Sequence, residues 1–547
     1  MKRIITKSAG LALACSAPLA MAFTFETENV RGSFDSTIAA GMAVRTESQD
    51  CDLITAGATG HHPPSGCQSP VAGFGDQGDL NYDKGDLFTN YIKGTHELLL
   101  KFPDDYTFMA RGSWIRDFAA TDTTGALSYG SPPDVHKNGL TDNAHDDLRF
   151  KARLLDLWVS KSFDVGEQRV RARLGNQVIN WGESIFTLGG INNTNAYDIA
   201  ALMRPGTQLK EAVLPAPMLS LASGVGGGVN VETYYQFDWN KSEVPPVGSY
   251  WSTTNGLGDG MQAYGLHSKN ARNSGQWGIA VHWQPRDSDL NLGAYVMRYH
   301  DKLPALDIQF DPNTGAALQE WQYPEDRMLY GISANMPVGD WAVGTELSYR
   351  PKDAVTLNPY IDYCQGSRGK CWKDEKKLQW HLTGLYSQTP QNSSRWLELT
   401  GASTGTLVSE LVVVHYPGLN DEYDGEPTAP GTYSWIKDPN VAPTSKGDKT
   451  SSGISLDYSL TYENTLLPGW QVTPGVFYSR GLGGRTPNLS QTWTDGASSM
   501  NLYLNFVRNP ASWQVSFNYA KFMGGATPYD QLLGDRDYVG FVVSRTL

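Results

Sequence analysis

Three arginines, Arg169, Arg171 and Arg173, occupy every second position of one short stretch of the chain. Apolar residues fill the positions between them, and successive side chains of a β-strand point to opposite faces. Three guanidinium groups would therefore line up on one face of a strand. Such a row is suited to an anionic head group, because a guanidinium donates two parallel hydrogen bonds to an oxyanion. It is also suited to an internal ladder of salt bridges on a lumen wall, and the nearest charged candidates for such a ladder are Asp156, Glu183, Lys210 and Glu211.

Covalent and metal chemistry have little support in the sequence. The ten histidines are scattered and show no nucleophile motif, so we expect neither an enzyme nor a cofactor. Asp79, Asn81 and Asp83 have the spacing of a calcium loop. However, glycine comes one place late, at Gly85, and Asn90 stands where a glutamate would close the loop. Calcium is therefore only an alternative here, and no metal site is expected.

The strands that would carry such rows show a strict alternation of apolar and polar residues. From Ile454 to Glu463, apolar and aromatic side chains occupy one phase and polar side chains the other. The pattern recurs along the chain, for example at 277–283, 341–349 and 513–519. In an exported chain, it is typical of a transmembrane β-barrel with lipid outside and water inside. A soluble sandwich or propeller would alternate too, but it would not need so many aromatic strand ends, and no propeller repeat is found.

The sequence thus predicts an all-β fold, a transmembrane antiparallel β-barrel of about 14–18 strands with short turns at one end and long loops at the other. The long loops are expected near 46–80, 118–146, 352–376 and 417–450. A barrel of this size has a lumen too wide for wall side chains alone to fill. An internal plug or constriction is therefore expected.

The first 22 residues have the features of a secretory signal peptide: a basic start, an apolar run at 11–19, and Ala20-Met21-Ala22 before Phe23. The barrel is then expected over 23–547, in the outer membrane of a Gram-negative bacterium. The signal carries three positive charges and no negative one, so its removal changes the formal net charge from −13 to −16. This acidity argues against nucleic acid as a partner. It suits outer loops that meet membrane lipid and cation-bridged lipopolysaccharide.

Four cysteines follow the signal, as two pairs that are local in sequence: Cys51 with Cys67, and Cys364 with Cys371. Export leads to an oxidising compartment, so two disulfides are expected. A metal site is the rival interpretation, but no C-x-x-C spacing is present.

The stretch 180–219 departs from the alternating pattern and is predicted to be a lumen plug. Proline lacks a ladder donor and is unwelcome inside a strand, and three prolines occur here. The apolar residues Val213, Leu214, Met218 and Leu219 would offer the greasy half of a head-group site, or simply pack the plug against the wall. The residues expected on the substrate path or plug are Asn180, Trp181, Glu183, Arg204, Lys210, Glu211, Val213, Leu214, Pro215, Pro217, Met218 and Leu219.

Several motifs resemble an uncharacterised, domain-of-unknown-function family of proteobacterial outer-membrane β-barrel proteins. They are Asn81–Leu87, Asn180–Ser184 (Asn-Trp-Gly-Glu-Ser), Gly189–Asn192, Leu209–Met218 and Pro246–Tyr250. The resemblance implies a barrel similar in style to long-chain fatty-acid channels. It also implies a hydrophobic cargo such as a lipid, sterol, terpene or alkane-like compound. Genes of this kind often lie beside an inner-membrane exporter of the resistance-nodulation-division class and a periplasmic carrier, which are the implied partners.

The function expected from the sequence is an outer-membrane channel or transporter for hydrophobic or amphipathic small molecules. Two alternatives stay open. One is a general aqueous porin, which would favour an open, charged constriction. The other is a structural or assembly partner of an envelope export system that transports nothing itself.

Overall fold

The structure of the protein is a computed structural model. It describes residues 23–50, 53, 76–123, 139–310, 317–357, 370–420, 446–508, 512–527 and 530–547. The predicted signal peptide and the cysteines Cys51, Cys67 and Cys364 lie outside these residues, so the signal and both disulfides stay predictions. Cys371 is described and is buried.

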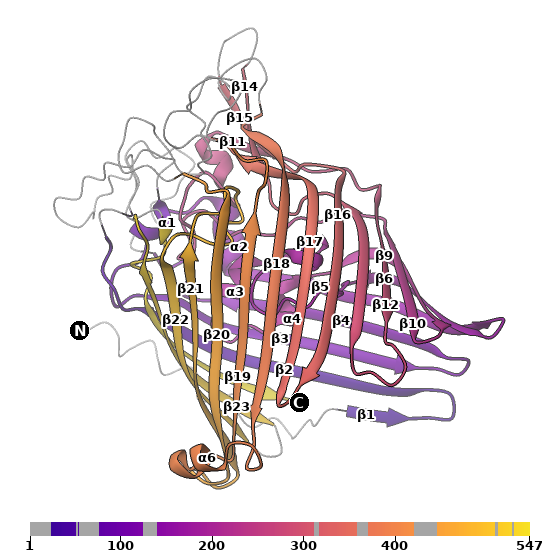
Figure 1. The fold of residues 1–547 in the computed structure, drawn as a ribbon. Coiled ribbons are helices and arrows are strands. Elements are labelled where there is room, and N and C mark those ends of the chain that lie inside the picture. The colour runs from indigo at the N-terminus through magenta and orange to yellow at the C-terminus, as the bar shows by residue number, and fades with distance from the viewer. Residues whose placement is uncertain are drawn as a thin grey trace.

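Eighteen antiparallel strands form a closed ring (Figure 1). Each pairs with the next strand of the ring in chain order. The strands are β2 (Arg31–Arg45), β3 (Leu87–Lys101), β4 (Tyr106–Asp117), β5 (Phe150–Val165), β6 (Gln168–Gln177), β9 (Ala216–Gly226), β10 (Val229–Gln236), β12 (Gln276–Trp283), β13 (Asn291–Tyr299), β16 (Arg327–Val338), β17 (Trp341–Thr356), β18 (Trp372–Gln388), β19 (Thr404–His415), β20 (Thr450–Glu463), β21 (Trp470–Gly483), β22 (Ala497–Arg508), β23 (Trp513–Gly524) and β24 (Tyr538–Thr546).

The seam of the barrel is the pairing of the last strand with the first wall strand. In this pairing β24 and β2 run antiparallel, with Thr37 opposite Thr546 and Arg45 opposite Tyr538. The short strand β1 (Phe23–Glu26) only extends β2 as a hairpin. Because the seam is paired along its length, the described barrel has no free edge at this point.

The two faces of the wall differ in polarity, as the alternation predicts. On β5 and β6, the side chains of Leu157, Val159 and Leu174 are exposed on the outer face, whereas Asp156 and Arg173 lie on the inner face. Apolar side chains are exposed in the same way on other strands: Ile279, Val281, Ile332, Leu347, Leu382, Leu502, Phe517 and Val539. An apolar outer band around a polar lumen is the arrangement of a transmembrane β-barrel. The predicted fold class is confirmed.

The two ends of the barrel carry different connections. Turns such as 166–167, 227–228 and 339–340 are short and lie at the end that also holds the C-terminus (Figure 1). The helix α6 (Ser394–Thr400) lies at this end too. Long connections join the strands at the other end, although the predicted 352–376 loop is shorter than expected because β17 and β18 extend into it. No helix among the described residues is long and apolar enough to cross a membrane.

Small elements of the long connections gather at that other end. They include a three-stranded sheet and several short helices. They are α1 (Gln77–Leu80), α2 (Asp142–Arg149), η3 (Met261–Tyr264), β11 (Leu266–Lys269), β14 (Ala305–Phe310) and β15 (Ala317–Gln322).

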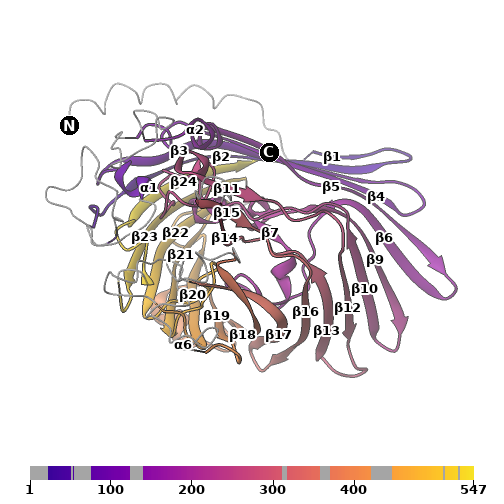
Figure 2. The same ribbon diagram turned by 90° about the horizontal axis from the view of Figure 1, so that it is seen from above.

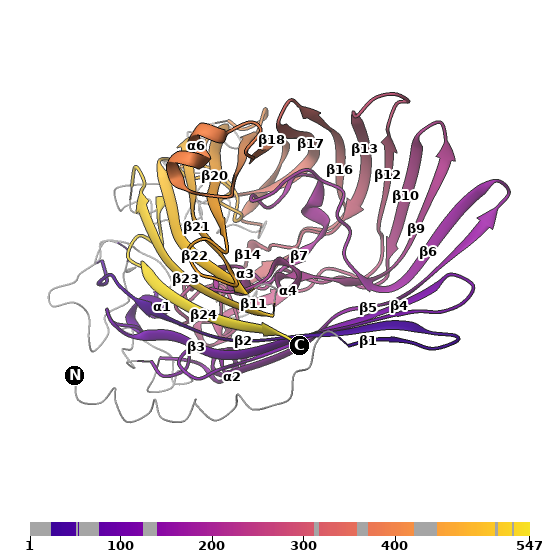
Figure 3. The same cartoon turned by 90° about the horizontal axis from the view of Figure 1, so that it is seen from below.

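One long connection, residues 178–215 between β6 and β9, is called the insert below. It contains η2 (Gly190–Thr194), β7 (Ala196–Tyr197), α3 (Ile199–Met203), α4 (Leu209–Ala212) and β8 (Val213–Leu214). Figure 3 shows β7, α3 and α4 inside the ring of strands, and Figure 2 shows β7 there too. In Figure 1, α3 and α4 lie at the level of the strands rather than above them.

The predicted C-terminal boundary of the plug, at residue 219, is wrong. Pro217, Met218 and Leu219 belong to β9 and are part of the wall. Pro217 is the second residue of that strand, and a proline near a strand start is tolerated in a way that an interior proline is not.

Candidate functional site

The insert is fixed to the wall on the side of β3. Glu211 of α4 accepts hydrogen bonds from Lys93 Nζ at 2.5 Å and from Thr95 Oγ1 at 2.5 Å. Tyr91 donates its hydroxyl to the carbonyl of Pro205 at 2.6 Å. These wall residues alternate along β3, so one inner face holds this end of the insert.

The tip of the insert is fixed to the opposite wall by a buried carboxylate. Glu410 of β19 accepts the backbone N–H groups of Ile185, Phe186 and Thr187 at 3.2, 2.9 and 2.8 Å. On the neighbouring strand β18, His381 Nδ1 lies 2.8 Å from Glu410 Oε1. Both side chains are fully buried. Hydrogen bonds to charged groups are roughly twice as strong as neutral ones, so this is a strong point of attachment.

A second carboxylate, Glu346 of β17, binds the insert beside the first. It accepts the N–H groups of Glu183 at 2.5 Å and Ile191 at 2.9 Å. A Cβ atom added to Gly190, where φ is +60°, would lie 2.0 Å from Glu346 Oε1. Only glycine lets the backbone approach this closely. Together, Glu346, His381 and Glu410 are called the latch.

The latch explains two motifs of the sequence. Asn192 Oδ1 accepts the N–H groups of Trp181 and Gly182 at 3.0 and 3.1 Å, which folds Asn-Trp-Gly-Glu-Ser and Gly-Gly-Ile-Asn against each other. Trp181 also donates its indole N–H to Glu232 of β10 at 2.8 Å. Sequence reasoning missed all three latch residues. Glu346 does fall in the polar phase of a predicted strand, 341–349, but nothing local distinguishes it from other inward-facing residues.

The tip of the insert presents apolar side chains inside the barrel. Ile185 and Leu188 are 46 % and 42 % exposed, although they lie within the ring of strands. The ring of Phe186 is 5.2 Å from that of Phe477 on β21, in an edge-to-face arrangement. Phe477 is the register partner of Asp457, on the inner face. The tip therefore also contacts the wall at β21, through the aromatic pair of Phe186 and Phe477.

The apolar residues that the sequence placed at a cargo site lie elsewhere. Met218 and Leu214 are buried, and Met218 belongs to an apolar cluster with Trp181 that joins the insert to the wall. Leu219 is exposed and opposite Leu174, on the outer face. Val213 is partly buried in the short strand β8. The expectation of a greasy half-site at Leu219 is wrong, and Leu214 and Met218 serve packing.

The arginine row lies on the inner face of β6. Arg173 is the register partner of Ser160 on β5 and Ser220 on β9. Its guanidinium carbon lies 4.1 Å from the centroid of the Trp158 ring. Arg169 is at the exposed rim and pairs with Asp105 at 2.5 Å.

The expected ladder between the arginine row and charged residues of the insert is wrong among the described residues. Asp156 pairs with Arg111 at 2.6 Å, and Lys210 pairs with Glu97. Glu183 accepts a hydrogen bond from Asn335, and Glu211 binds Lys93, as described above. Of the other predicted plug residues, Asn180 is exposed, Pro215 follows β8, and Arg204 is the C-cap of α3.

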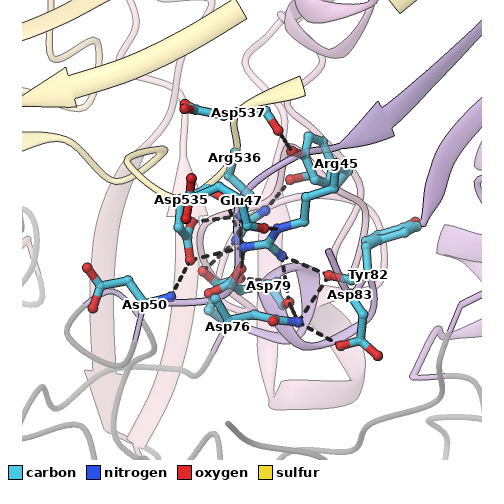
Figure 4. Close-up of polar contacts among 12 residues, drawn as sticks. Arg45, Glu47, Asp50, Asp76, Asp79, Tyr82, Asp83, Asp535, Arg536 and Asp537 are labelled. Carbon is cyan, nitrogen blue, oxygen red and sulfur yellow. Dashed lines mark hydrogen bonds and ion pairs between the residues drawn. The ribbon is translucent and has the colours of Figure 1, made fainter. Parts of the chain in front are cut away.

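A buried charge cluster lies at the long-loop end of the seam (Figure 4). Arg45 of β2 pairs with Asp79 at 2.7 Å and with Asp535 at 3.1 Å. Arg536 pairs with Asp76 at 2.9 Å and with Asp79 at 3.2 Å. All five side chains are almost fully buried. The cluster joins the connection that contains α1 to the connection before β24.

The calcium alternative at the same place does not fit this geometry. The carboxylate of Asp79 is bound by two guanidinium groups. Asn81 Oδ1 accepts from Gln77 at 2.9 Å, and Asp83 Oδ1 accepts from Gln49 at 2.9 Å. The three side chains point to different partners and do not converge as calcium ligands must.

The charge cluster should loosen as the pH rises. Burial, followed by the charge of Asp79, raises the pKa of Asp535 to about 8, and burial raises the pKa of Asp76 to about 6. Carboxyls with raised native pKa values stabilise the native form at low pH, and this contribution is lost as the pH rises through about 6 and then about 8. Hydrogen exchange of 76–86 and 530–537, corrected for intrinsic rates, should therefore be slower at pH 6 than at pH 9. D535N should flatten this dependence, whereas equal protection of the wild type at both values would contradict it.

Comparisons with known proteins give one family. The family described as "Protein of unknown function (DUF1302)" matches residues 3–547. A comparison with curated proteins finds no match.

Three solved structures illustrate the likeness to known folds. OccAB1 of Acinetobacter baumannii is 11% identical, with 94% of this chain and 96% of that chain covered and a TM-score of 0.42. OpdK of Pseudomonas aeruginosa, solved with vanillate, is 11% identical over 94% and 98%, with a TM-score of 0.41. OccK2 (OpdF) of Pseudomonas aeruginosa, in complex with glucuronate, is 12% identical over 94% and 98%, with a TM-score of 0.40. At these scores the likeness adds nothing to the barrel already described.

Proposed function

The chain belongs to the DUF1302 family of proteins of unknown function, and from that premise we propose that it is an outer-membrane channel for hydrophobic or amphipathic small molecules. The closed wall with its apolar outer band supports the outer membrane as its location. The family resemblance supports a Gram-negative host, with an inner-membrane exporter and a periplasmic carrier as partners. The acidic net charge supports contact of the outer loops with cation-bridged lipopolysaccharide.

One observation carries the proposal: the insert lies inside the ring, bound to both walls, and its tip presents Ile185, Phe186 and Leu188 opposite Phe477. An apolar body gains from contact with such side chains at about 25 cal/mol per Å² of apolar surface removed from water. A small hydrophilic solute gains nothing there and must keep its own hydration. The constriction therefore favours molecules with an apolar part.

A second candidate, a general aqueous porin, is supported by the inner face of β20–β23. Side chains there are mostly small and polar. They include Asp457, which accepts a hydrogen bond from the hydroxyl of Tyr503 at 2.8 Å. The others on this face are Ser455, Ser459, Ser479, Ser499, Asn501 and Asn518. A polar lane of this kind can hold water. The two candidates differ in which solutes pass the tip.

The test is entry of two neutral probes into cells of a porin-deficient host that produces the protein. N-phenyl-1-naphthylamine reports hydrophobic entry by its fluorescence, and a small sugar reports aqueous entry. Replacing Ile185, Phe186 and Leu188 by glutamine should slow entry of the hydrophobic probe by about tenfold, which corresponds to about 1.4 kcal/mol. The reason is that the apolar contacts of the probe at the tip are lost.

A matched triple variant provides the control. It replaces three other exposed apolar residues, Leu399, Leu466 and Leu467. These lie at the short-turn end, on α6 and on the turn after β20. Their replacement by glutamine should leave entry unchanged. If the wild type admits the sugar freely and excludes the hydrophobic probe, the porin candidate replaces the proposal.

A further inference from the structure

Two arginines on the inner wall have no anionic partner. Neither Arg171 nor Arg173 forms an ion pair with any residue that the structure describes, whereas Arg169, two positions earlier on the same strand, does. The Nε atom of Arg173 is buried and has no hydrogen-bond partner among the described residues. Burying a charged group without a partner is costly. The arrangement is therefore one that a bound anion would complete.

The acidic side chains around the pair already have partners of their own. Asp156 and Glu97 both bind Arg111, and Glu97 also binds Lys210 of the insert. Glu232, on β10, accepts the indole N–H of Trp181. An ion pair of Arg171 or Arg173 with Asp156 or Glu97 would take that carboxylate from its present cationic partner. The carboxylates of Asp156 and Glu97 are thus matched by other cations, and Glu232 binds an uncharged indole N–H.

The surroundings of the pair suit a small oxyanion with an apolar body. Arg171 and Arg173 are two residues apart on one strand face, so their Cα atoms are separated by about 7 Å. Ser160 and Ser220 flank Arg173 as its cross-strand neighbours and carry hydroxyl groups. Trp158 packs against the guanidinium of Arg173 and adds a flat apolar surface. A guanidinium fork matches a carboxylate geometrically, with two parallel hydrogen bonds.

The pair also lies on the inner face of the strand that leads into the insert. β6 ends at Gln177, and the insert begins with the next residue. Arg173 is thus five residues before the start of the insert, toward the short-turn end, and Arg171 is seven.

We infer that Arg171 and Arg173 form a binding site for the carboxylate head group of an amphipathic cargo. This inference rests on the proposed function, because it names the class of molecule that the same channel takes. Trp158 lies beside the site as the surface for the adjoining apolar part.

The experiment compares decanoate with the neutral decanol on the purified channel in planar bilayers, where binding of each probe is measured as block of the ion current. The double variant R171Q/R173Q should weaken block by decanoate on the order of 30-fold, because two charge-assisted contacts are lost. Block by decanol should not change. R169Q is the matched control, because it removes one positive charge from the same strand at the rim of the barrel. It should leave block by decanoate and block by decanol unchanged.

A second variant separates the geometry of the site from its charge. R171K/R173K keeps both positive charges but loses the planar forks, so decanoate block should fall between those of the wild type and the glutamine variant. Decyl phosphate is a further arm, and tighter block by it than by decanoate would reassign the site to phosphate and overturn the carboxylate inference. Heat-modifiable migration on gels verifies that each variant is a folded barrel.

The outcomes distinguish the two levels of the argument. If decanoate blocks the R171Q/R173Q channel as strongly as the wild-type channel, the inference is overturned. Entry of the neutral hydrophobic probe would still support the proposed function. If neither decanoate nor the neutral probe interacts with the wild-type channel, the proposed function fails and the inference fails with it.

Discussion

Replacing residues 178–215 by a two-residue Asn-Gly turn should convert the protein into a wide, steadily conducting pore. Gln177 and Ala216 are register partners on β6 and β9, so a tight turn can join them without altering the wall. Barrels of roughly 16–18 strands leave an aqueous channel when nothing fills them. Single-channel conductance in planar bilayers should therefore rise on the order of tenfold over the wild type.

The boundary of this deletion matters, because removal of 216–219 would cut into β9 and disturb the wall itself. A matched control shortens a different connection. Gln388 and Gly405 are register partners on β18 and β19, and the segment between them, with α6, lies at the short-turn end. Shortening it should leave the conductance unchanged. An insert deletion that folds and conducts no more than the wild type would show that the insert does not obstruct the lumen.

Glu410→Ala should release the tip of the insert without removing it. Three backbone N–H groups, those of Ile185, Phe186 and Thr187, lose their acceptor in this variant. Hydrogen bonds to a charged acceptor contribute about 1.5–3 kcal/mol each. A total of about 4 kcal/mol would raise the population of a released tip by about a thousandfold. Bilayer recordings should then show frequent transitions to a larger conductance.

Two variants check that this effect belongs to the latch. Glu410→Gln keeps one acceptor oxygen and should give an intermediate frequency of opening, because the amide is uncharged and a weaker acceptor. Glu398→Ala removes the same side chain from an exposed position on α6 and should record like the wild type. If recordings of Glu410→Ala match those of the wild type, the tip is held by its apolar contacts alone.

Local patterns in the sequence predicted the wall better than the contacts across it. The alternation of apolar and polar residues predicted a barrel with the correct range of strands, and the motifs predicted the family that the match over 3–547 confirms. The period of two also assigned Arg171 and Arg173 to one face, the inner one. These properties depend on neighbours in the chain, which the sequence displays directly.

Contacts across the lumen could not be predicted in the same way. Glu410 meets Phe186 across 224 positions of sequence, and Glu346 meets Ile191 across 155. The sequence around each of these residues does not indicate which distant residue it contacts. The same limit applies to Glu211, which binds Lys93 rather than the arginine row. The prediction that Pro217 lies in the plug was wrong for a different reason, because the rule against proline in strands has an exception near strand starts.

The charge cluster at the seam has a consequence for how the protein assembles. Arg536 and Asp76 are 460 positions apart in the chain, and Arg45 lies on the strand that meets the last strand. Contacts of such long range form late, because a long loop must close first. Until β24 reaches β2, Arg45 lacks Asp535. Closure of the ring thus brings Asp535 to the buried Arg45, a contact that no shorter intermediate has. A chain truncated before Asp535 should lack this link at the long-loop end of the seam.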